Sequence, residues 1–325
     1  VFCNPDIRTF HYAFNTRLKN WFGLNYRNKR ATLCGRIIQL PHQNKPPFWR
    51  NDFGQNNLLM SSYHLSQNNI VHYYNKLLSY NPDEIVGYPS SIYQIARYIT
   101  DTGLPPLKAK LLITTAETLL SYQSYSIKKA FDAPLVDQYG CTEMVFFASH
   151  CECGTMHIHP EEGIVETVDK FGNPVVGEPG TLIATGLFNW VMPLIRYKVG
   201  DRVRISIEKI KCDCGRQFPI IESIEGRLDD ILYTKDGTPV GRLDPVFKGG
   251  SNIREAKIIQ YEMGDIELMI VPLNNFTDEN IKWIKNELEK RFGRDLVLNI
   301  NIVNTIHRDR NGKFKAVEGR YRPKS

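Results

Sequence analysis

The sequence predicts an α/β fold: a mainly parallel sheet with helices, a β-rich zinc-stabilised subdomain, and then a small α+β C-terminal lobe. Between residues 84 and 139, apolar runs of strand length alternate with helical patterns of about a dozen residues, which is typical of βαβ units. After residue 150 the strands are short and are separated by Gly and Pro turns. Beyond residue 226, two strands, a helix and a further strand follow one another.

The composition is that of an ordinary globular protein with room for one large domain and a smaller one. The chain has 325 residues, of which 42% are hydrophobic and 23% charged, and its formal net charge is +6. The excess charge is spread out except over residues 307–324, and it fits an anionic ligand such as a nucleotide about as well as it fits RNA or no charged partner at all. The sequence contains no apolar run long enough for a membrane span and no visible signal peptide, so we expect a cytoplasmic protein without a transmembrane segment. Nothing in the sequence indicates an oligomeric state.

The first half of the chain carries the clearest periodic patterns. Apolar residues recur every three or four positions over residues 6–21, which predicts an amphipathic helix. A strand is predicted at 31–40, the Asn- and Pro-rich stretch 45–61 is predicted to be irregular, and Ser66 is predicted to cap a helix that runs to residue 78. The remaining elements expected in this half are strands at 84–86, 110–114 and 135–139 and helices from about 89 to 100 and from 121 to 131.

The second half of the chain contains two different patterns of predicted secondary structure. Strands are predicted at 163–168, 180–184 and 202–207, and then at 253–261, 265–271 and 296–303 with a helix at 277–292. We therefore expect a core over residues 1–228, made of an α/β part (1–150) and a β-rich subdomain (151–228). A mobile lobe is expected over residues 229–325, with its hinge near residues 228–231.

The stretch VDQYGCTE at residues 136–143 is the first candidate site. A strand runs into a turn at Gly140, and the turn places Thr142 and Glu143 at the carboxyl end of the strand, where open α/β sheets bind ligands. A hydroxyl beside a carboxylate suits a phosphate and its Mg²⁺, which prefers hard oxygen ligands. Taken alone, the same stretch could be an ordinary strand–turn–helix corner.

Three further stretches follow in order along the chain. WVMPLIRYKVGDRV at 190–203 ends a strand on Asp201, whose carboxylate can accept two vicinal ribose hydroxyls or simply cap a turn. GRLDDIL at 226–232 offers Arg227, which could hold a ribose or phosphate oxygen or form a surface ion pair. RNGKFKAV at 310–317 places Lys313 after a flexible Gly312, either facing a developing negative charge or within a solvated basic tail.

These four ordered motifs make the chain resemble the adenylate-forming enzymes. More narrowly it resembles the phenylacetate-CoA ligase branch, and especially the CapK-type proteins associated with capsular polysaccharide biosynthesis. The narrower resemblance depends on GYPSS at 87–91, MPLIRYKVGD at 192–201 and FKGGSNIREAKIIQY at 247–261, and it covers residues 2–321.

The resemblance implies a role for each motif residue. Tyr139, beside Gly140, would lie against the adenine, Thr142 would contact the phosphate, and Glu143 would bind Mg²⁺. Among the later motifs, the implied roles are ribose binding by Asp201 and Arg227, a hinge at Asp229 and a mobile catalytic lysine at Lys313. The segment TTAETL at 114–119 corresponds to one that borders the nucleotide, with Thr and Ala in place of the family's usual glycines.

The implied reaction joins ATP and a carboxylic acid into an acyl-adenylate, releases pyrophosphate, and passes the acyl group to a thiol of coenzyme A or a carrier protein. The sequence does not reveal the acid. Tyr88, Pro89, Phe146 and Phe147 could line an acyl pocket or could belong to the core. The alternative is a non-catalytic binding module of the same fold within polysaccharide assembly.

The front of the chain departs from the family pattern. The chain begins Val1-Phe2-Cys3 without an initiator Met, and residues 1–4 resemble the strand that follows the family's Ser/Thr/Gly-rich phosphate-wrapping loop. Backbone amides of such a loop form an anion cradle. We therefore expect the natural amino terminus to lie upstream, and the 325 residues by themselves to bind ATP poorly and to be inactive.

The cysteines predict a metal site. Of seven cysteines, four form two C-x-C pairs, each followed by Gly: Cys151, Cys153, Cys212 and Cys214. Four thiolates satisfy a tetrahedral zinc and leave no position for water, so the site would be structural. One of the nearby histidines, His150, His157 or His159, could replace a Cys. A zinc-ribbon nucleic-acid binder is a third and disfavoured interpretation, because the sequence lacks a concentrated basic face with interleaved aromatic residues; no nucleic-acid partner is expected.

Overall fold

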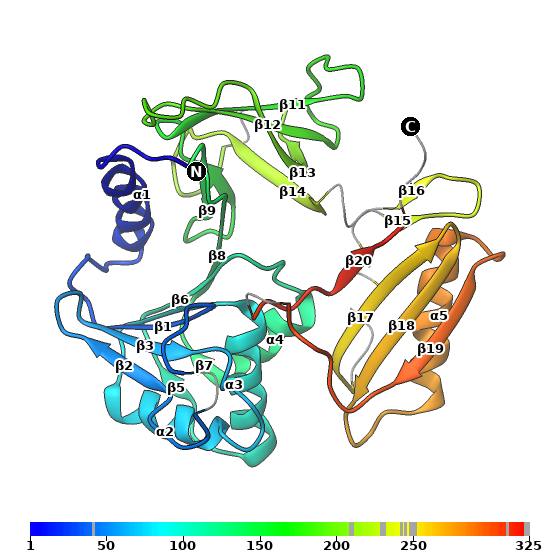
Figure 1. The fold of residues 1–325 in the computed structure, drawn as a ribbon, viewed down its shortest axis with the longest axis horizontal. Coiled ribbons are helices and arrows are strands. Elements are labelled where there is room, and N and C mark those ends of the chain that lie inside the picture. Colours follow the sequence, from blue (N-terminus) through cyan, green and yellow to red (C-terminus); the bar gives the residue numbers. More distant parts are fainter. Residues whose placement is uncertain are drawn as a thin grey trace.

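The computed structural model describes residues 1–40, 43–207, 211–227, 232–240, 243, 246, 252–309 and 312–321, apart from the side chains of Arg227 and Pro239. One sheet of twelve strands runs through the first two thirds of the chain, in the order β11-β12-β13-β14-β10-β9-β8-β6-β4-β1-β3-β2 (Figure 1). Its strands are β1 (Arg30–Cys34), β2 (Trp49–Asp52), β3 (Asn57–Ser61), β4 (Glu84–Gly87), β6 (Leu111–Thr114), β8 (Leu135–Gly140), β9 (Phe147–His150), β10 (Met156–Ile158), β11 (Gly163–Val168), β12 (Gly180–Gly186), β13 (Tyr197–Ile205) and β14 (Ile220–Arg227).

The prediction of a mainly parallel sheet is only partly right, because the sheet is mixed. The pairings β3–β1, β1–β4, β4–β6 and β6–β8 are parallel, whereas the edge strand β2 is antiparallel to β3. From β8 onward, every pairing through β9, β10, β14, β13, β12 and β11 is antiparallel. The β-rich subdomain therefore continues the sheet of the α/β part. The two parts meet at β8 and β9, which are joined by a short connection and pair as antiparallel neighbours.

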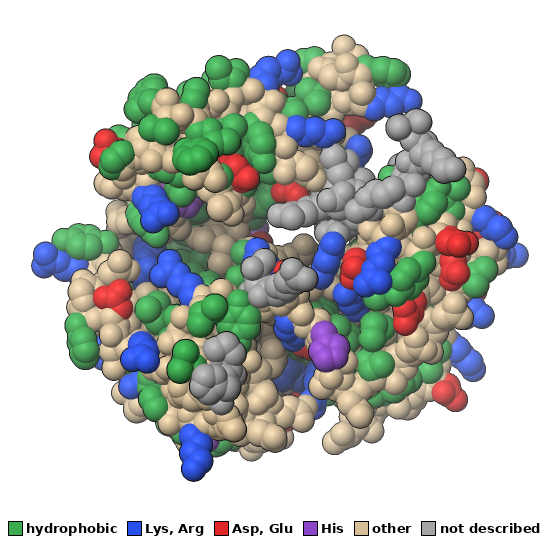
Figure 2. All heavy atoms as spheres, in the orientation of Figure 1, with side chains coloured by type: hydrophobic (Ala, Val, Ile, Leu, Met, Phe, Trp, Pro, Cys, Tyr) green, Lys and Arg blue, Asp and Glu red, His purple; other side chains and the backbone are tan. Residues whose placement is uncertain are grey.

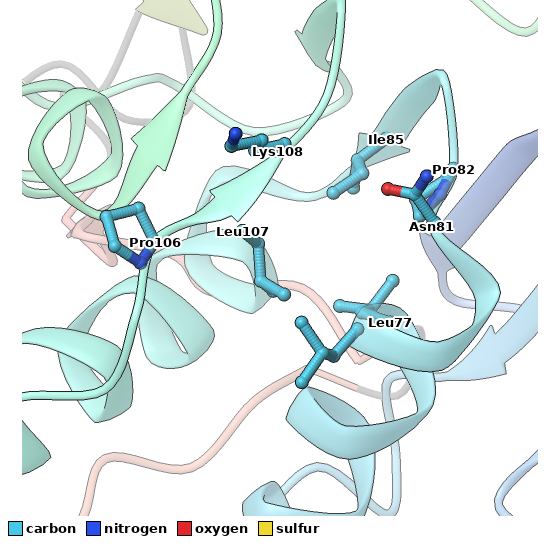
Figure 3. Close-up of a pocket in the computed structure, with 8 residues that line it drawn as sticks. Leu77, Asn81, Pro82, Ile85, Pro106, Leu107 and Lys108 are labelled. Carbon is cyan, nitrogen blue, oxygen red and sulfur yellow. The ribbon is translucent and has the colours of Figure 1, made fainter.

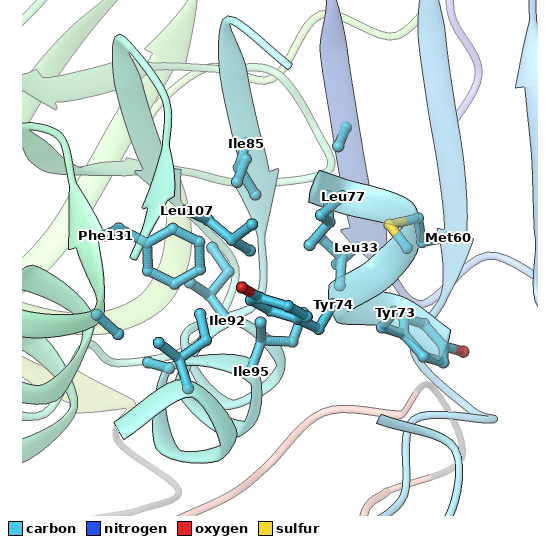
Figure 4. Packing of buried hydrophobic residues seen from close by; sticks show 14 of the residues in the cluster. Leu33, Met60, Tyr73, Tyr74, Leu77, Ile85, Ile92, Ile95, Leu107 and Phe131 are labelled. Atoms are coloured by element: carbon cyan, nitrogen blue, oxygen red, sulfur yellow. The ribbon is translucent and has the colours of Figure 1, made fainter. Parts of the chain in front are cut away.

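Helices cover both faces of the parallel half of the sheet. Three helices, α2 (Ile70–Tyr80), α3 (Pro89–Thr102) and α4 (Ser121–Ala130), pack on one face over a core that includes Leu33, Tyr73, Ile92 and Phe131 (Figure 4). Helix α1 (Ile7–Trp21) covers the other face through Phe14 and Leu18. Because both faces are covered, strand β6 is buried along its whole length.

Three sequence predictions in this region are wrong. The strand predicted at 31–40 is β1, which already ends at Cys34. The stretch 45–61 is not irregular throughout, since it contains β2 and β3, and β3 pairs in parallel with β1. Ser66 does not cap α2. Its carbonyl accepts the amides of Asn69 and Ile70 in a turn, and the helix begins at Ile70.

The last third forms the predicted α+β lobe. Its sheet has the order β19-β18-β17-β20, with α5 (Asp278–Phe292) packed on one face. The strands are β17 (Ile253–Glu262), β18 (Asp265–Pro272), β19 (Val297–Ile302) and β20 (Val317–Gly319); two-stranded sheets are formed by β15 (Leu232–Tyr233) with β16 (Pro239–Val240), and in the core by β5 (Leu107–Lys108) with β7 (Phe131–Asp132).

The predicted bounds of helix α5, residues 277–292, lie within one residue of the observed ones. Thr277 and Asn280 form a capping box at its start, acidic residues occupy its first turn, and Lys290 and Arg291 occupy its last turn, so both ends complement the helix dipole. The predicted boundary between residues 228 and 229 lies outside the described residues. Within the described residues, no helix combines the length and apolar character that a membrane crossing requires.

A buried charge cluster joins α1 to the sheet. Glu84 Oε1 lies 2.7 Å from Lys19 Nζ and 2.9 Å from Arg30 Nε, and the Glu84 side chain is 1% exposed. Burial lowers the pKa of Lys19, and the charge of Glu84 opposes that shift. The ammonium of Lys19 therefore depends on Glu84 for its compensating charge.

We expect Glu84→Gln to lower the free energy of unfolding by roughly 3–5 kcal/mol, because it leaves a buried ammonium without its counter-charge. Denaturant unfolding measures the change. Asp101→Asn is the matched control: it breaks the exposed Arg97–Asp101 pair on α3 and should cost less than about 1 kcal/mol. Equal effects of the two substitutions would contradict the role assigned to Glu84.

Candidate functional site

The candidate site lies where the parallel strands end. Strands β1, β4, β6 and β8 share a direction, so their carboxyl ends meet at one edge of the sheet. The loops that follow β4, β6 and β8 hold residues 88, 115–120 and 141–146. This is the edge that the sequence predicted to carry the chemistry. On the face drawn in Figure 2, the surface is hollowed between the β-rich part at the top and the parts below it.

The motif VDQYGCTE has the predicted form. Strand β8 ends at Gly140, and the amide of Met144 donates to the carbonyl of Cys141 at 3.1 Å, so Thr142 and Glu143 are the central residues of a β-turn. A Cβ at Gly140 would lie 3.2 Å from the carbonyl oxygen of Phe146, so a side chain there would crowd the backbone of the next strand. The turn therefore presents a hydroxyl and a carboxylate side by side.

Two tyrosines connect the β8 end to the β-rich subdomain. Tyr139 donates its hydroxyl to Asp201 Oδ2 at 2.7 Å, and Tyr197 donates its hydroxyl to Glu143 Oε1 at 3.2 Å. Both Tyr197 and Asp201 lie on β13. The structure thus brings together the predicted adenine-side residue Tyr139, the predicted ribose-side residue Asp201, and the predicted magnesium-side residue Glu143.

The structure describes the residues of the GRLDDIL motif only in part. The backbone of Arg227 lies opposite Asp201 across the β13–β14 pairing, while its side chain is outside the described atoms. Gly226, which pairs with Arg202 next to a register shift, has a φ of +101°, and Gly200, which precedes Asp201, has a φ of +97°. Glycine adopts such values without strain. Asp229, the predicted hinge, lies outside the described residues.

Lys313 lies on a turn of the small lobe that reaches the core. The Asp309 amide donates to the Lys313 carbonyl at 2.9 Å, and Asp309 Oδ1 accepts the Lys313 amide at 2.8 Å. The Lys313 ammonium lies 5.9 Å from the centre of the Tyr88 ring, at the end of β4. The predicted lysine is therefore at the same edge of the sheet as the β8 turn.

The bonds between VDQYGCTE and TTAETL at this edge were not predicted from the sequence. Asp137, inside the first motif, accepts the Thr114 hydroxyl at 2.7 Å, and burial raises the pKa of its carboxyl to about 7. Gln138 donates to the Thr115 hydroxyl at 3.1 Å. These bonds fasten the end of β8 to the end of β6. The pattern of a strand entering a glycine turn contains no signal for such cross-strand partners.

The four aromatic and proline residues considered for an acyl pocket are all buried. Phe146 belongs to the core of the β-rich subdomain and Phe147 to the core beneath α1. Tyr88 is 6% exposed and Pro89 begins α3. The structure thus places the two phenylalanines in cores, whereas Tyr88 faces Lys313.

The small cavity drawn in Figure 3 is not part of this edge. It has a volume of about 170 Å³ and is lined by residues such as Leu77, Pro82, Ile85 and Leu107. Asn81 and Pro82 precede β4, so the cavity lies at the amino ends of the strands, opposite the candidate site. None of the predicted site residues lines it.

A second candidate site is a cluster of sulfur and nitrogen ligands in the β-rich subdomain. One possible ligand atom from each of Cys151, His157, Cys212 and Cys214 lies within 4.8 Å of all the others. Sγ of Cys151 is 3.6 Å from Sγ of Cys212, and Sγ of Cys214 is 3.4 Å from Nε2 of His157. Ligands of a tetrahedral zinc are separated by about 3.8 Å when Zn–S is about 2.3 Å, so these side chains fit the ion.

The cluster contains three of the four predicted cysteines. Cys153 is exposed and is not a member, whereas His157 is fully buried. His157 Nδ1 faces the carbonyl of Phe218 at 3.4 Å, an arrangement that orients Nε2 toward the cysteines. His150 and His159 lie elsewhere: Nδ1 of His150 accepts the amide of Asp137, and the His159 ring stacks on Trp21.

Comparison with known proteins found one matching family model and several similar proteins. The model of the CapK C-terminal domain matches residues 232–319. Protein CapK of Staphylococcus aureus is 30% identical over 307 residues, which cover 93% of this chain and 67% of that protein. The phenylacetate-coenzyme A ligase of Thermus thermophilus is 28% identical over 164 residues, covering 48% of this chain and 36% of that enzyme.

The fold matches solved CoA ligases. A crystal structure of 2-hydroxyisobutyryl-CoA ligase in the postadenylation state superimposes with a TM-score of 0.74 at 18% identity, covering 97% of this chain and 69% of that one. The same ligase in the thioesterification state gives a TM-score of 0.55 at 17% identity, with the same coverage.

Proposed function

Because this chain belongs to the CapK-type family of adenylate-forming enzymes, which is related to the phenylacetate-CoA ligases, we propose that it activates a carboxylic acid with ATP. The product would be an acyl-adenylate, and the acyl group would then pass to a thiol. The observation that carries the proposal is the edge of the sheet at which the Thr142–Glu143 turn, the Tyr139–Asp201 bond and the Lys313 turn all lie. Since the chain spans 67% of the length of CapK, the activity is proposed for the whole protein.

The first half-reaction brings two anions together. A carboxylate oxygen of the acid attacks the α-phosphorus of ATP, an O–P bond forms, and the bond to pyrophosphate breaks. The ammonium of Lys313 would neutralise charge that develops on the phosphate and acid oxygens, while Thr142 would donate its hydroxyl to a phosphate oxygen. Mg²⁺ held by Glu143 would supply further positive charge beside the triphosphate when bound.

Nucleotide binding would use the wall formed by β8, β13 and β14. The ring of Tyr139 packs edge-on against Phe146 at 5.1 Å, so its position is fixed before a base stacks on it. Asp201 would accept ribose hydroxyls, with Arg227 opposite it on β14. The Tyr139 hydroxyl already holds one Asp201 oxygen, so that bond and the ribose would share the carboxylate.

The second half-reaction requires the small lobe to turn. The structure superimposes better on the postadenylation state of 2-hydroxyisobutyryl-CoA ligase than on its thioesterification state, which supports an arrangement suited to the first half-reaction. Turning the lobe about the predicted hinge at Asp229 would withdraw Lys313 and let a thiol reach the acyl-adenylate. We propose coenzyme A as that thiol, because the related ligases are CoA ligases; a carrier protein is the alternative.

We also propose that Cys151, His157, Cys212 and Cys214 hold a structural zinc ion. The site would join the turn between β9 and β10 to the segment that leads into β14, since Cys151 and Cys212 are 61 residues apart along the chain. All four ligands come from the protein, so no position is left for a reacting water. The cytoplasmic location and the role in capsular polysaccharide biosynthesis stay predictions from the sequence.

Acid-dependent exchange of labelled pyrophosphate into ATP tests the proposed function. The assay uses protein expressed from its complete coding sequence, with Mg²⁺ and a panel of aromatic, aliphatic and hydroxy acids. We expect at least one acid to stimulate exchange, and Glu143→Gln to reduce it by roughly 10²-fold or more, since the metal loses a ligand. Exchange with none of the acids would favour a non-catalytic binding module.

A further inference from the structure

A carboxylate of the core holds the backbone beside Lys313. Glu117 lies in the loop between β6 and α4, and its Oε1 accepts the amide of Phe314 at 2.6 Å. The same carboxylate accepts the amide of Ser90 through Oε2 and the Ser90 hydroxyl through Oε1, both at 3.0 Å. One side chain thus joins the start of α3 to the residue that follows Lys313.

We propose that Glu117 is a positioning residue for Lys313. It docks residues 312–314, called the lysine turn below, on the core for adenylation, and it releases them when the small lobe rotates. The inference rests on the proposed function, because it deepens the role of the same site. Glu117 touches the backbone of the lysine turn, so it acts on the reaction through Lys313.

Apolar and steric contacts surround the docking bond. Phe314 is 7% exposed and packs with Leu120 of the core and with Val271 and Ile306 of the small lobe. A Cβ at Gly312, whose φ is +74°, would come within 3.3 Å of Ser62 Oγ and the Tyr63 ring. The lysine turn therefore fits closely against the core on both sides of Lys313.

The small lobe holds the other side of the same segment. The guanidinium of Arg308 lies 4.6 Å from the centre of the Phe314 ring and forms an ion pair with Glu255 on β17. Arg308, which precedes Lys313 along the chain, is thus held within the small lobe. Phe314, which follows Lys313, is held by Glu117 of the core. A bond between the lobes at this point forms only while the lobe faces the core as in this structure.

The chemistry of a carboxylate suits this junction better than that of an amide. Glu117 receives three hydrogen-bond donors with two acceptor oxygens. In Glu117→Gln, one oxygen becomes an NH₂ group that faces an N–H or O–H donor, while the side-chain size is unchanged. Hydrogen bonds to a charged acceptor are the stronger ones, and their loss corresponds to roughly 10- to 100-fold in an equilibrium constant.

The kinetic test separates the two half-reactions of the full-length enzyme. We expect Glu117→Gln to slow pyrophosphate exchange roughly 10- to 100-fold with little change in the KM for ATP. Thioester formation from a supplied acyl-adenylate should keep its wild-type rate, because that step does not need the docked turn. Glu289→Gln, a carboxylate-to-amide change on α5, is the control and should leave both rates unchanged. A wild-type exchange rate in Glu117→Gln would overturn the proposal.

Hydrogen exchange provides a readout that does not depend on activity. The Phe314 amide is protected by Glu117, so Glu117→Ala and Glu117→Gln should exchange it roughly 10-fold faster or more, and Glu289→Gln should not. Unchanged Phe314 protection in both Glu117 variants would overturn the docking contact. If protection depends on Glu117 but the wild type activates no acid, the docking contact is supported and the proposed function fails.

Discussion

Lys313→Ala should reduce acid-dependent pyrophosphate exchange by roughly 10²- to 10³-fold, the size expected when one preorganised positive group is removed from a charged transition state. Lys313 lies on a turn that is closed by Asp309 and docked on the core by Phe314, so its ammonium is held at the edge of the sheet. The loss should fall on the rate of exchange more than on ATP binding, because the lysine acts on charge that develops in the reaction.

The same substitution should spare the second half-reaction. Thioester formation from a supplied acyl-adenylate should remain within about threefold of wild type, because the proposed rotation of the small lobe would withdraw Lys313 before that step. Lys290→Ala, on the exposed end of α5, is the matched control and should leave exchange unchanged. A Lys313→Ala protein that exchanges pyrophosphate at the wild-type rate would exclude Lys313 as the catalytic lysine.

Loss of the proposed zinc should strongly lower the stability of the protein. We expect the purified protein to contain one zinc per chain, and Cys212→Ser to abolish zinc binding and lower the free energy of unfolding by at least about 3 kcal/mol, because binding of a structural metal contributes directly to folding. The ligands join the β9–β10 turn to the segment before β14, so their release loosens the β-rich subdomain. Elemental analysis and thermal unfolding measure the two effects.

The ligand set can be tested residue by residue. His157→Ala should lose zinc as Cys212→Ser does, whereas Cys153→Ser should keep it, since Cys153 is exposed and lies outside the cluster. Cys3→Ser controls for the loss of a cysteine elsewhere in the chain. If Cys153→Ser loses zinc and His157→Ala keeps it, the ligand set is the one with four cysteines. Absence of zinc from the wild-type protein would contradict the metal site altogether.

Local patterns predicted most elements of the fold. Helix α1 followed from apolar periodicity, and the helix expected at 277–292 is α5. Strand β3 was missed because its five residues follow an Asn-rich stretch, and its stability comes from pairing with β1 rather than from its own pattern. The mixed character of the sheet was missed for a similar reason, since the direction of β9 depends on a turn and not on the composition of the strand.

The candidate site also has features that the sequence predicted and features that it did not. The Thr142–Glu143 turn could be predicted because a strand, a glycine and two polar residues are contiguous in the sequence. Glu117 lies in TTAETL, which was expected to border the nucleotide, but its contact with Phe314 could not be predicted because the two residues are 197 apart along the chain. His157 was only one of three nearby histidines in the sequence. Its burial, and the ring orientation that the Phe218 carbonyl favours, distinguish it in the structure.

In the proposed reaction the carboxylate of an acid attacks the α-phosphate of ATP, and transfer of oxygen between them tests this step most directly. An acid that stimulates exchange is prepared with ¹⁸O in its carboxylate and incubated with the full-length protein, ATP, Mg²⁺ and a thiol acceptor. Mass spectrometry should find one ¹⁸O atom in each AMP released, because thioester formation leaves a carboxylate oxygen on the phosphate. Unlabelled AMP, or label in inorganic phosphate released with ADP, would contradict an acyl-adenylate.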